Sequence, residues 1–299
     1  MSTPVTLHSL LGNHPQTKAL KSGAVSSPLV NFDYFEVKVA NTQFKAMVRD
    51  LKYDFGELAI ITFLQAKIFG KPLVVLPATI VGRNQHHTIF YNSAKGPLTA
   101  RDLNGKRVGV RAYTQTTGAW VRGFLAEDYG VDLDSVHWVT FEDPHVAEYK
   151  DPPIVERAPE GKLIKQMLLD GELDAAILGD MAEEGPLKHL IPDHETRGKQ
   201  WAAKHGGVPI NHLAVMRESI VKERPDAVRE VYRVLKESRG LAQDIPTGAE
   251  DPLRFGIGAV SQSLDQIIAY ALDQGLIPRK LSAAELFADA ARILGAAGA

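Results

Sequence analysis

The hydrophobic and polar positions of this chain form short apolar runs that alternate with longer amphipathic stretches. The apolar and alternating runs predict strands at residues 5–11, 33–39, 58–61, 72–81, 88–92, 107–110, 136–141, within 170–180, and at 209–216. Stretches with helical periodicity follow most of these strands. The repeated order of strand and helix indicates an α/β fold with a mainly parallel sheet and helices on both of its faces.

Helix signals complete this pattern and make the C-terminal third helical. Helices are predicted at residues 15–21, from 41 or 42 to 51, from the strand end at 61 through 67, up to 129, at 162–169, and near 219–243, 251–273 and 282–294. Residues 143–159 are rich in proline and charge without periodicity. We predict a long loop there, at a lobe surface or over a cleft.

The order of elements predicts two lobes joined by two crossings of the chain. The chain leaves the first lobe near residues 92–95 and returns near 209–216. Residues 1–95 and 213–299 then form lobe 1, which carries the C-terminal helices, and residues 96–212 form lobe 2. Ligands of such folds bind beyond the carboxyl ends of the strands, so we expect a hinged cleft between the lobes.

The second lobe opens with a strand, a polar turn and a helix that ends at Gly130. The turn holds Tyr113, Thr114, Gln115, Thr116 and Thr117. Hydroxyls, an amide and free backbone N–H groups at the positive end of a helix dipole suit an anionic ligand group. From the local sequence alone, one threonine as a simple N-cap is the better explanation of the pattern. The position after a strand and facing the cleft favours a carboxylate site.

Composition narrows the class of protein without changing this fold. The 299 residues are 44% hydrophobic and 23% charged, as in ordinary globular proteins. The formal net charge is −2 and no basic run is interleaved with aromatic residues, so a nucleic-acid partner is not expected. The chain has no cysteine, which excludes disulfides and thiolate chemistry. A homo-oligomer is compatible with the sequence.

The N-terminal sequence contains neither a basic n-region nor an uninterrupted apolar core of the kind that signal peptides have. No apolar run approaches the roughly 18 residues of a membrane span. On this reading we expect a cytoplasmic protein without a membrane span.

Four stretches carry a resemblance to a known family: DLNGKRVGV at 102–110, AWVRGFLAEDYGVDLDSVHW at 119–138, LDGELDAAILG at 169–179 and PINHLAVMRESIVKERP at 209–225. They resemble 4,5-dihydroxyphthalate decarboxylase and its relatives, cytoplasmic enzymes on the type 2 periplasmic-binding-protein fold. The helix Trp120-Val121-Arg122-Gly123 is the most specific part. The resemblance implies cofactor-independent decarboxylation of a hydroxylated, phthalate-like carboxylic acid.

Two segments depart from the family pattern. Gln85 stands where the resemblance leads us to expect an arginine, although His86 keeps the histidine that follows. The first loop carries His8 and Asn13 where the family tends to have acidic and aromatic residues. Adjacent carboxylates favour bidentate arginine contacts, so the loss of one arginine argues against a phthalate substrate.

Decarboxylation of an electron-rich ring needs an anchor for the anion, an acid for the ring carbon and a contact to the para hydroxyl. Histidine titrates near working pH, so the candidate catalytic residues are His86, His212 and, as a carboxylate that orients a histidine, Glu57. The candidate substrate-binding residues are His8, Asn13, Arg83, His87, Tyr113, Thr114, Gln115, Thr116, Thr117, Trp120 and Asn211. Tyr113 or Trp120 would flank the ring.

Simpler structural roles compete with several of these assignments. His86 and His87 are adjacent, so at most one faces the cleft if the segment is extended. His212 lies in an apolar run, where a core or hinge role is as common as a catalytic one. Arg122 and Glu127 are expected to be solvated helix residues or an intrahelical pair.

No local histidine spacing predicts a metal site, and no nucleotide-binding or serine-hydrolase motif occurs. We therefore expect neither metal nor organic cofactor. The partner is expected to be a small aromatic or organic carboxylate. The alternative function is a non-catalytic solute-binding protein for a small organic anion, in transport or sensing.

Overall fold

The computed structural model describes residues 3–243 and 245–299. Its strands are β1 (Val5–Leu10), β2 (Val30–Tyr34), β3 (Phe55–Ala59), β4 (Leu73–Gly82), β5 (Ile89–Asn92), β6 (Arg107–Val110), β7 (His137–Thr140), β8 (Val155–Arg157), β9 (Ala175–Ile177), β10 (Leu187–His189) and β11 (Ile210–Arg217). Its α-helices are α1 (Lys18–Lys21), α2 (Phe44–Arg49), α3 (Ile60–Ile68), α4 (Thr116–Tyr129), α5 (Ile164–Asp170), α6 (His194–His205), α7 (Glu218–Glu223), α8 (Pro225–Gly240), α9 (Ile257–Asp273), α10 (Ala283–Leu286) and α11 (Ala288–Leu294). Within the described ranges, no helix combines the length and apolar character that a membrane crossing requires.

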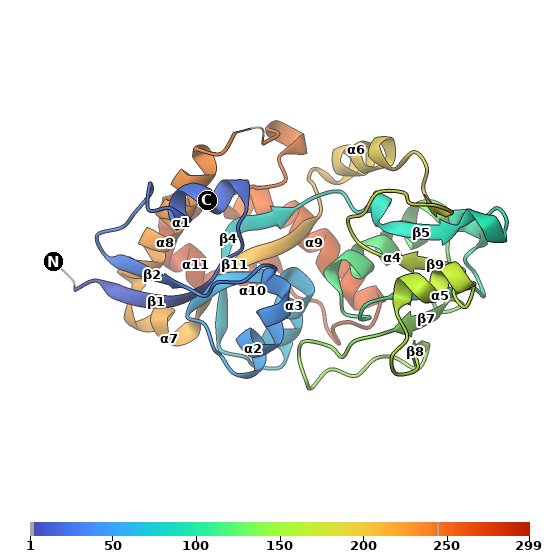
Figure 1. Cartoon of the computed structure of the whole chain (residues 1–299). Coiled ribbons are helices and arrows are strands. Elements are labelled where there is room, and N and C mark those ends of the chain that lie inside the picture. The colour runs from blue at the N-terminus through green and yellow to red at the C-terminus, as the bar shows by residue number, and fades with distance from the viewer. Residues whose placement is uncertain (1–2, 244) are drawn as a thin grey trace.

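The strands form two separate sheets, one in each lobe (Figure 1). The first has the order β2-β1-β3-β11-β4, and the second has the order β10-β5-β9-β6-β7-β8. The central pairs β1–β2, β1–β3, β6–β7 and β6–β9 are parallel, whereas β11 and β5 run antiparallel to their neighbours. The predicted two-lobed α/β fold is confirmed, and the antiparallel strands β5 and β11 are those that follow the two crossings between the lobes.

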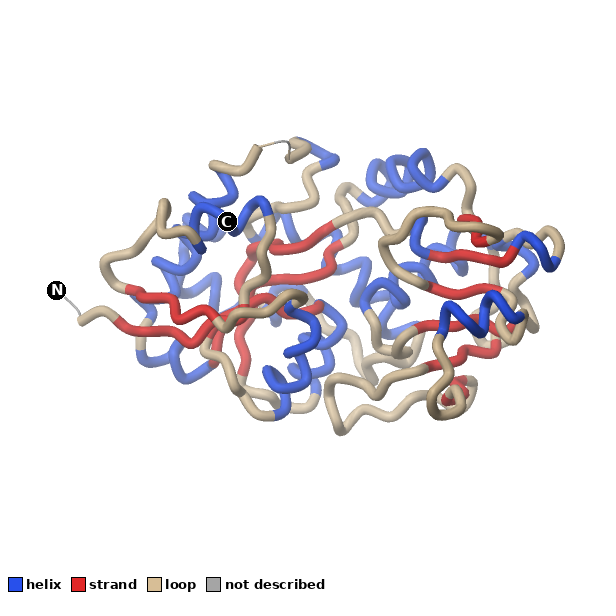
Figure 2. The backbone as a smooth tube through the Cα atoms, viewed as in Figure 1, coloured by secondary structure: helices blue, strands red, loops and turns tan. Residues whose placement is uncertain are grey.

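Strand β4 shows why helices cover both faces of the first sheet. Its side chains point alternately to opposite sides. Val74 and Leu76 pack into the core that contains α8 and α11, whereas Leu73 and Val75 join the core that contains α3 and α9. Figure 2 shows the strands of this sheet in red with blue helices on both sides. A strand buried on both faces explains the continuous apolar run in the sequence.

The lobe boundaries differ from the predicted ones at both crossings. Strand β5 pairs with β9 and β10 in the second sheet, so residues 89–92 do not belong with lobe 1. Ile210 and His212 already pair with β4 in the first sheet. An apolar pattern identifies a strand but not the sheet that its hydrogen bonds join. We propose that the crossings lie near residues 83–88 and 206–209.

Helix α4 ties the second lobe to the strand that re-enters the first lobe. Trp120 is fully buried, and its Nε1–H donates to the carbonyl oxygen of Ile210 at 2.8 Å. Arg122 is also fully buried, where it donates to Gln274 Oε1 at 2.7 Å and lies 4.0 Å from the centroid of the Tyr113 ring. The expectation of a solvated Arg122 was wrong because the guanidinium bridges two elements instead of facing water.

Three local predictions needed correction. The strand predicted at residues 33–39 instead spans Val30–Tyr34, as β2. Tyr34 pairs with Ser9 near the end of β1, so residues 35–39 have no neighbouring strand to pair with. Residues 194–205 form α6, which the sequence did not predict because few of its residues are apolar; Trp201 and Ala202 are buried. Glu127 pairs with residues of α6 and with Tyr270, not within its own helix.

The close contact between α4 and α9 makes a prediction about Gly123. A Cβ at this position would lie 2.1 Å from Tyr270 Cδ2, so an alanine must displace the buried Tyr270 ring or push the helices apart. Gly123→Ala should destabilise the protein by about 1–3 kcal/mol in urea unfolding. Gly258→Ala is the matched control, because no atom lies within 4 Å of its Cβ position in α9. Equal stability of the two variants would show that α4 is not packed as described.

Candidate active site

A cavity lies between the lobes where several strands of both sheets end. Its volume is about 210 Å³, smaller than the roughly 300 Å³ at which pockets for drug-sized ligands begin, so a small ligand is favoured. We call this cavity the cleft; it is lined by His14, Asn41, Phe44, Ala59, Thr62, Val81, Arg83, Arg111, Thr114, Gln115, Thr116, Thr117, His145, Asn211 and His212.

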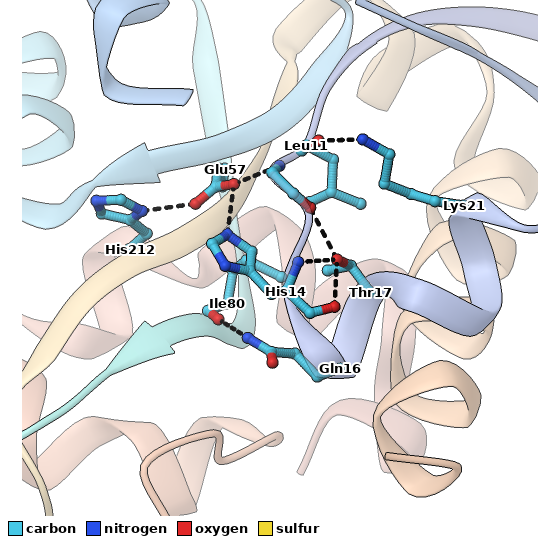
Figure 3. Close-up of polar contacts among 9 residues, drawn as sticks. Leu11, His14, Gln16, Thr17, Lys21, Glu57, Ile80 and His212 are labelled. Atoms are coloured by element: carbon cyan, nitrogen blue, oxygen red, sulfur yellow. Dashed lines mark hydrogen bonds and ion pairs between the residues drawn. The ribbon is translucent and has the colours of Figure 1, made fainter. Parts of the chain in front are cut away.

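Glu57 forms the centre of the polar network at this cleft (Figure 3). It lies on β3, is fully buried, and binds one histidine through each carboxylate oxygen. His14 Nε2 lies 3.0 Å from Oε1, and His212 Nδ1 lies 2.6 Å from Oε2. The backbone N–H of Gly12 also donates to Oε1 at 2.6 Å. His212 reaches Glu57 because β11 pairs antiparallel with β3, on which Glu57 lies.

The loop after β1 has to approach Glu57 closely to present His14. A Cβ on Gly12 would lie 2.6 Å from His14 Nε2 and 2.7 Å from Glu57 Oε1, so this position requires glycine. Thr17 holds the loop, since its hydroxyl donates to the carbonyl oxygen of Gly12 at 2.8 Å and accepts from the N–H of His14 at 3.0 Å (Figure 3).

The protonation of Glu57 follows from these contacts. Burial favours the neutral acid and would raise the pKa of the carboxyl. Hydrogen bonds from His14 and His212, together with favourable electrostatic interactions with both side chains, outweigh burial and hold the pKa of Glu57 far below its usual range. The carboxylate therefore stays ionised and stabilises an imidazolium on either histidine when it forms.

The polar turn before α4 faces the cleft, as the sequence predicted. The N-cap of α4 is Gln115, and its side chain makes no capping hydrogen bond, so a threonine cap is not the explanation. Thr116 Oγ1 instead accepts from the N–H of Ile61 at 3.3 Å, in the first turn of α3. Two helix N-termini therefore meet at the cleft, and both favour negative charge there.

Two arginines line the cleft, and each directly follows a strand of a different sheet. Arg83 follows β4, and its Nη1 binds Asp180 Oδ2 at 2.6 Å. Arg111 follows β6, and among the described residues its guanidinium has an acidic neighbour in Glu142 at 3.7 Å, too far for a hydrogen bond. Arg111 thus keeps N–H groups for a ligand. Gln85 does not line the cleft; it is fully buried and donates to Asn211 Oδ1.

The cleft unites several of the predicted site residues. Arg83, Thr114, Gln115, Thr116, Thr117, Asn211 and His212 line it, with Glu57 behind His212. Their roles in binding and catalysis stay predictions.

Six other predicted residues lie outside the cleft lining. His8 binds Asp33 at 3.0 Å and stacks on Tyr53, and Asn13 is exposed, because the first loop turns His14 rather than these side chains inward. Tyr113 and Trp120 are both buried. Tyr113 packs against Arg122, and Trp120 donates a hydrogen bond to the carbonyl oxygen of Ile210. They cannot flank a ring in the cleft.

The adjacent histidines after β4 also point elsewhere. His86 is 1% exposed and stacks on Phe124 with ring centroids 4.1 Å apart. His87 Nε2 binds Asp180 Oδ1 at 3.0 Å, and His87 lines a neighbouring cavity that also includes His189 and His194. Burial, followed by nearby positive groups, lowers the pKa of His86 to about 4, so His86 is neutral at pH 7.

Five polar residues of the cleft are missing from the predicted site residues: His14, Asn41, Thr62, Arg111 and His145. Arg111 directly follows a strand, so the rule that pointed to residues 113–117 could have included it. His145 lies in the loop that was predicted at a lobe surface or over a cleft. Its Nδ1 lies 2.8 Å from the hydroxyl of Thr62, which belongs to the other lobe.

The fold and the cleft define a class of protein: a two-lobed protein of the type 2 periplasmic-binding-protein-like fold with a polar cleft between its lobes. Among solved structures, the chain is similar to the alkanesulfonate-binding protein SsuA from Xanthomonas axonopodis pv. citri bound to MOPS, with a TM-score of 0.63 and 15% identity. The match covers 95% of this chain and 98% of that one. At this identity the likeness concerns the fold alone.

Sequence relatives define the family more closely. The chain is 27% identical to 4,5-dihydroxyphthalate decarboxylase of Comamonas testosteroni, over 93% of this chain and 94% of the relative. It is 32% identical to 4,5-dihydroxyphthalate decarboxylase of Pseudomonas putida, over 56% of this chain and 67% of the relative. No protein-family model matches the chain. The chain belongs to the 4,5-dihydroxyphthalate decarboxylase family.

The burial of His86 predicts a pH-dependent stability. The folded pKa of about 4 lies below the ordinary value of 6.5, so the unfolded chain binds more protons between these values. The contribution of His86 is therefore complete above pH 6.5 and is lost as the pH falls toward 4. The free energy of unfolding, measured in urea, should fall between pH 8 and pH 5 in the wild type. In His86→Phe this fall should be smaller by about 2 kcal/mol. Parallel pH profiles of the two proteins would contradict the assignment.

Proposed function

We propose that this protein is a carboxy-lyase that decarboxylates a hydroxylated, phthalate-like aromatic acid in the cleft. The observation that carries the proposal is the buried, ionised Glu57 hydrogen-bonded to His212 at the edge of a cleft lined by Arg83 and Arg111. Membership of the 4,5-dihydroxyphthalate decarboxylase family supports the same reaction. An electron-rich ring can accept the proton directly, so the reaction needs no organic cofactor.

The anion is held by the two arginines and the helix N-termini. Arg83 and Arg111 supply two guanidinium groups, which suits a substrate with two adjacent carboxylates. The argument against phthalate that rested on Gln85 loses its force, because Arg111 supplies a second guanidinium from another element. The N–H groups at the start of α4 bind the carboxylate that stays on the ring.

His212 supplies the proton. Its Nδ1 is engaged by Glu57, so Nε2 is the nitrogen that carries the transferable proton. As the imidazolium it protonates the ring carbon that bears the departing carboxylate. The bond between ring carbon and carboxylate then breaks, its electron pair restores the aromatic ring, and CO₂ leaves. Neutral His212 regains a proton from water, so one proton is consumed for each CO₂ released.

A second candidate function is binding of a small organic anion without chemistry. The likeness of the fold to an alkanesulfonate-binding protein favours it, since the same cleft can close on an anion that is not transformed. The cytoplasmic location and a homo-oligomeric state stay predictions from the sequence.

Replacement of the proton donor tests the enzymatic proposal. His212→Gln should lower kcat for CO₂ release from 4,5-dihydroxyphthalate by about 10²–10⁴ while substrate binding is retained. His8→Ala is the control histidine, because its side chain binds Asp33 outside the cleft lining. Unchanged CO₂ release from His212→Gln would refute the assigned acid. Tight binding of the substrate by the wild type without CO₂ release would favour the binding protein.

Arg111 should act on binding more than on the chemical step. Arg111→Lys keeps the charge but loses bidentate geometry, so KM should rise by about tenfold with a smaller change in kcat. Arg107→Lys is the matched control, because Arg107 begins the strand that Arg111 follows and pairs with Glu156 at the surface. Steady-state kinetics of the two variants decide the point, and equal KM values would remove Arg111 from the binding site.

A further inference from the structure

The loop of residues 141–154 leaves the second lobe after β7 and lies against the first lobe. Arg49 of α2 donates from Nε to the carbonyl oxygen of His145 at 2.8 Å and from Nη2 to that of Pro144 at 2.7 Å. Lys71 binds Glu148 at 2.6 Å. Figure 1 shows this green segment reaching toward α2 and α3. We call residues 141–154 the latch loop, because these contacts hold the two lobes together at the cleft.

The latch loop brings His145 into the cleft opposite the proton donor. His145 Nδ1 lies 2.8 Å from Thr62 Oγ1 of α3. The Phe44 ring meets both His145 and His212 edge-on, with centroid distances of 5.7 and 5.1 Å. The two histidines therefore come from different lobes and share one aromatic neighbour.

The two histidines have opposite electrostatic surroundings. Burial lowers the pKa of His145 to about 3, with further lowering by Arg111, Lys45, Arg49 and His212. His145 is therefore neutral at pH 7. His212, by contrast, binds a carboxylate that stays ionised. A neutral imidazole suits a hydrogen-bond acceptor, whereas a carboxylate beside an imidazole stabilises the imidazolium of a proton donor, so the two positions suit different roles.

We propose that His145 is a further catalytic residue that binds the ring hydroxyl para to the departing carboxylate, and that it does so only when the latch loop is closed. This inference rests on the proposed function and completes it. The proposed function assigns residues to the carboxylates and to the acid. It assigns none to the ring hydroxyl, which is the third requirement of the reaction. When His145 Nδ1–H donates to Thr62 Oγ1, Nε2 keeps a lone pair for the hydroxyl.

The step balances without net transfer of the hydroxyl proton. The hydroxyl donates a hydrogen bond to neutral His145 Nε2 while its oxygen pushes electrons into the ring, and the para carbon takes a proton from His212. The carbon–carboxylate bond then breaks, its electron pair re-forms the aromatic ring, and CO₂ leaves. The hydroxyl keeps its proton and His145 stays neutral, so only the proton from His212 is consumed.

The position of His145 explains why the latch loop and the chemistry are coupled. The anchoring carbonyls belong to His145 itself and to its neighbour Pro144, so release of Arg49 frees the backbone that carries the imidazole. Arg49 is exposed and does not line the cleft. It is therefore a positioning residue. The hydroxyl contact forms when the lobes close, which restricts proton transfer to the closed state.

A comparison of two ligands tests the hydroxyl contact separately from catalysis. Titration calorimetry measures the affinity for phthalate and for 4,5-dihydroxyphthalate in two proteins, His212→Gln and His212→Gln with His145→Ala, so that the dihydroxy ligand is not consumed. The protein that also carries His145→Ala should bind the dihydroxy ligand about tenfold more weakly than His212→Gln alone, with phthalate affinity changed less than about twofold. His137→Ala, an exposed histidine at the start of β7, is the control. Equal losses for both ligands overturn the proposal.

Kinetics of the anchoring arginine test the coupling. Arg49→Ala should lower kcat for CO₂ release by about tenfold or more with phthalate affinity retained, and Arg49→Lys should restore little because one ammonium cannot hold two carbonyls as the guanidinium fork does. Lys38→Ala, an exposed lysine of the first lobe, is the control. Wild-type kcat in Arg49→Ala overturns the coupling.

The two proposals fail in different ways. If the wild type binds both ligands but releases no CO₂, the decarboxylase proposal fails, and selective loss of the dihydroxy ligand in His145→Ala still supports the hydroxyl contact. If the wild type decarboxylates and His145→Ala keeps wild-type kcat and ligand preference, the proposed function stands and the role of His145 is refuted. Failure of the wild type to bind either ligand overturns both.

Discussion

A charged carboxylate buried in the middle of a sheet is the constraint on which the rest of this site depends. Glu57 is fully buried on β3, and an unpaired charge there would cost several kcal/mol. Three donors reach it, from Gly12, His14 and His212. The need to satisfy Glu57 therefore fixes the loop after β1, the glycine in that loop, and the register of β11 beside β3.

The same constraint links the active-site network to the path of the chain between lobes. His212 lies at the beginning of β11, directly after the crossing, and the preceding Ile210 accepts the hydrogen bond from Trp120 of α4. The motif Trp120 to Gly123 thus acts through packing and not through substrate contact. It holds the second lobe against the strand that carries His212, while the latch loop holds the lobes on the other side of the cleft.

Much of the fold could be predicted because it depends on local patterns. The apolar run of β4 and the unit of β6 and α4 were found with nearly correct bounds, since burial on both faces and helical periodicity leave a clear record in sequence. The lobe to which β5 belongs was not predictable in this way. Strand pairing depends on residues 80 to 100 positions away, such as those of β9 and β10.

In the candidate site, too, the residues placed by local sequence patterns were predicted, and those placed by distant contacts were not. Residues that directly follow strands, such as Arg83 and the turn before α4, were predicted from the rule that ligands bind at strand ends. Trp120 and Tyr113 were assigned to the ligand because an aromatic side chain beside a cleft and one beneath it look alike in sequence. His145 was missed because contacts with the first lobe, to Thr62 and Arg49, hold this residue of the second lobe in the cleft. No local sequence pattern records such contacts.

The presence of Glu57 also bears on the choice between binding and catalysis. A site that only holds an anion gains from positive groups and loses from a carboxylate nearby, because like charges repel across a cleft of low dielectric constant. Glu57 is nevertheless ionised beside a cleft that two arginines and two helix N-termini make favourable to anions. A carboxylate in that place offers no advantage for capture of the ligand. It does stabilise an imidazolium, and an imidazolium beside a bound aromatic acid is a proton donor. The charge arrangement therefore favours proton transfer over simple binding on this shared fold.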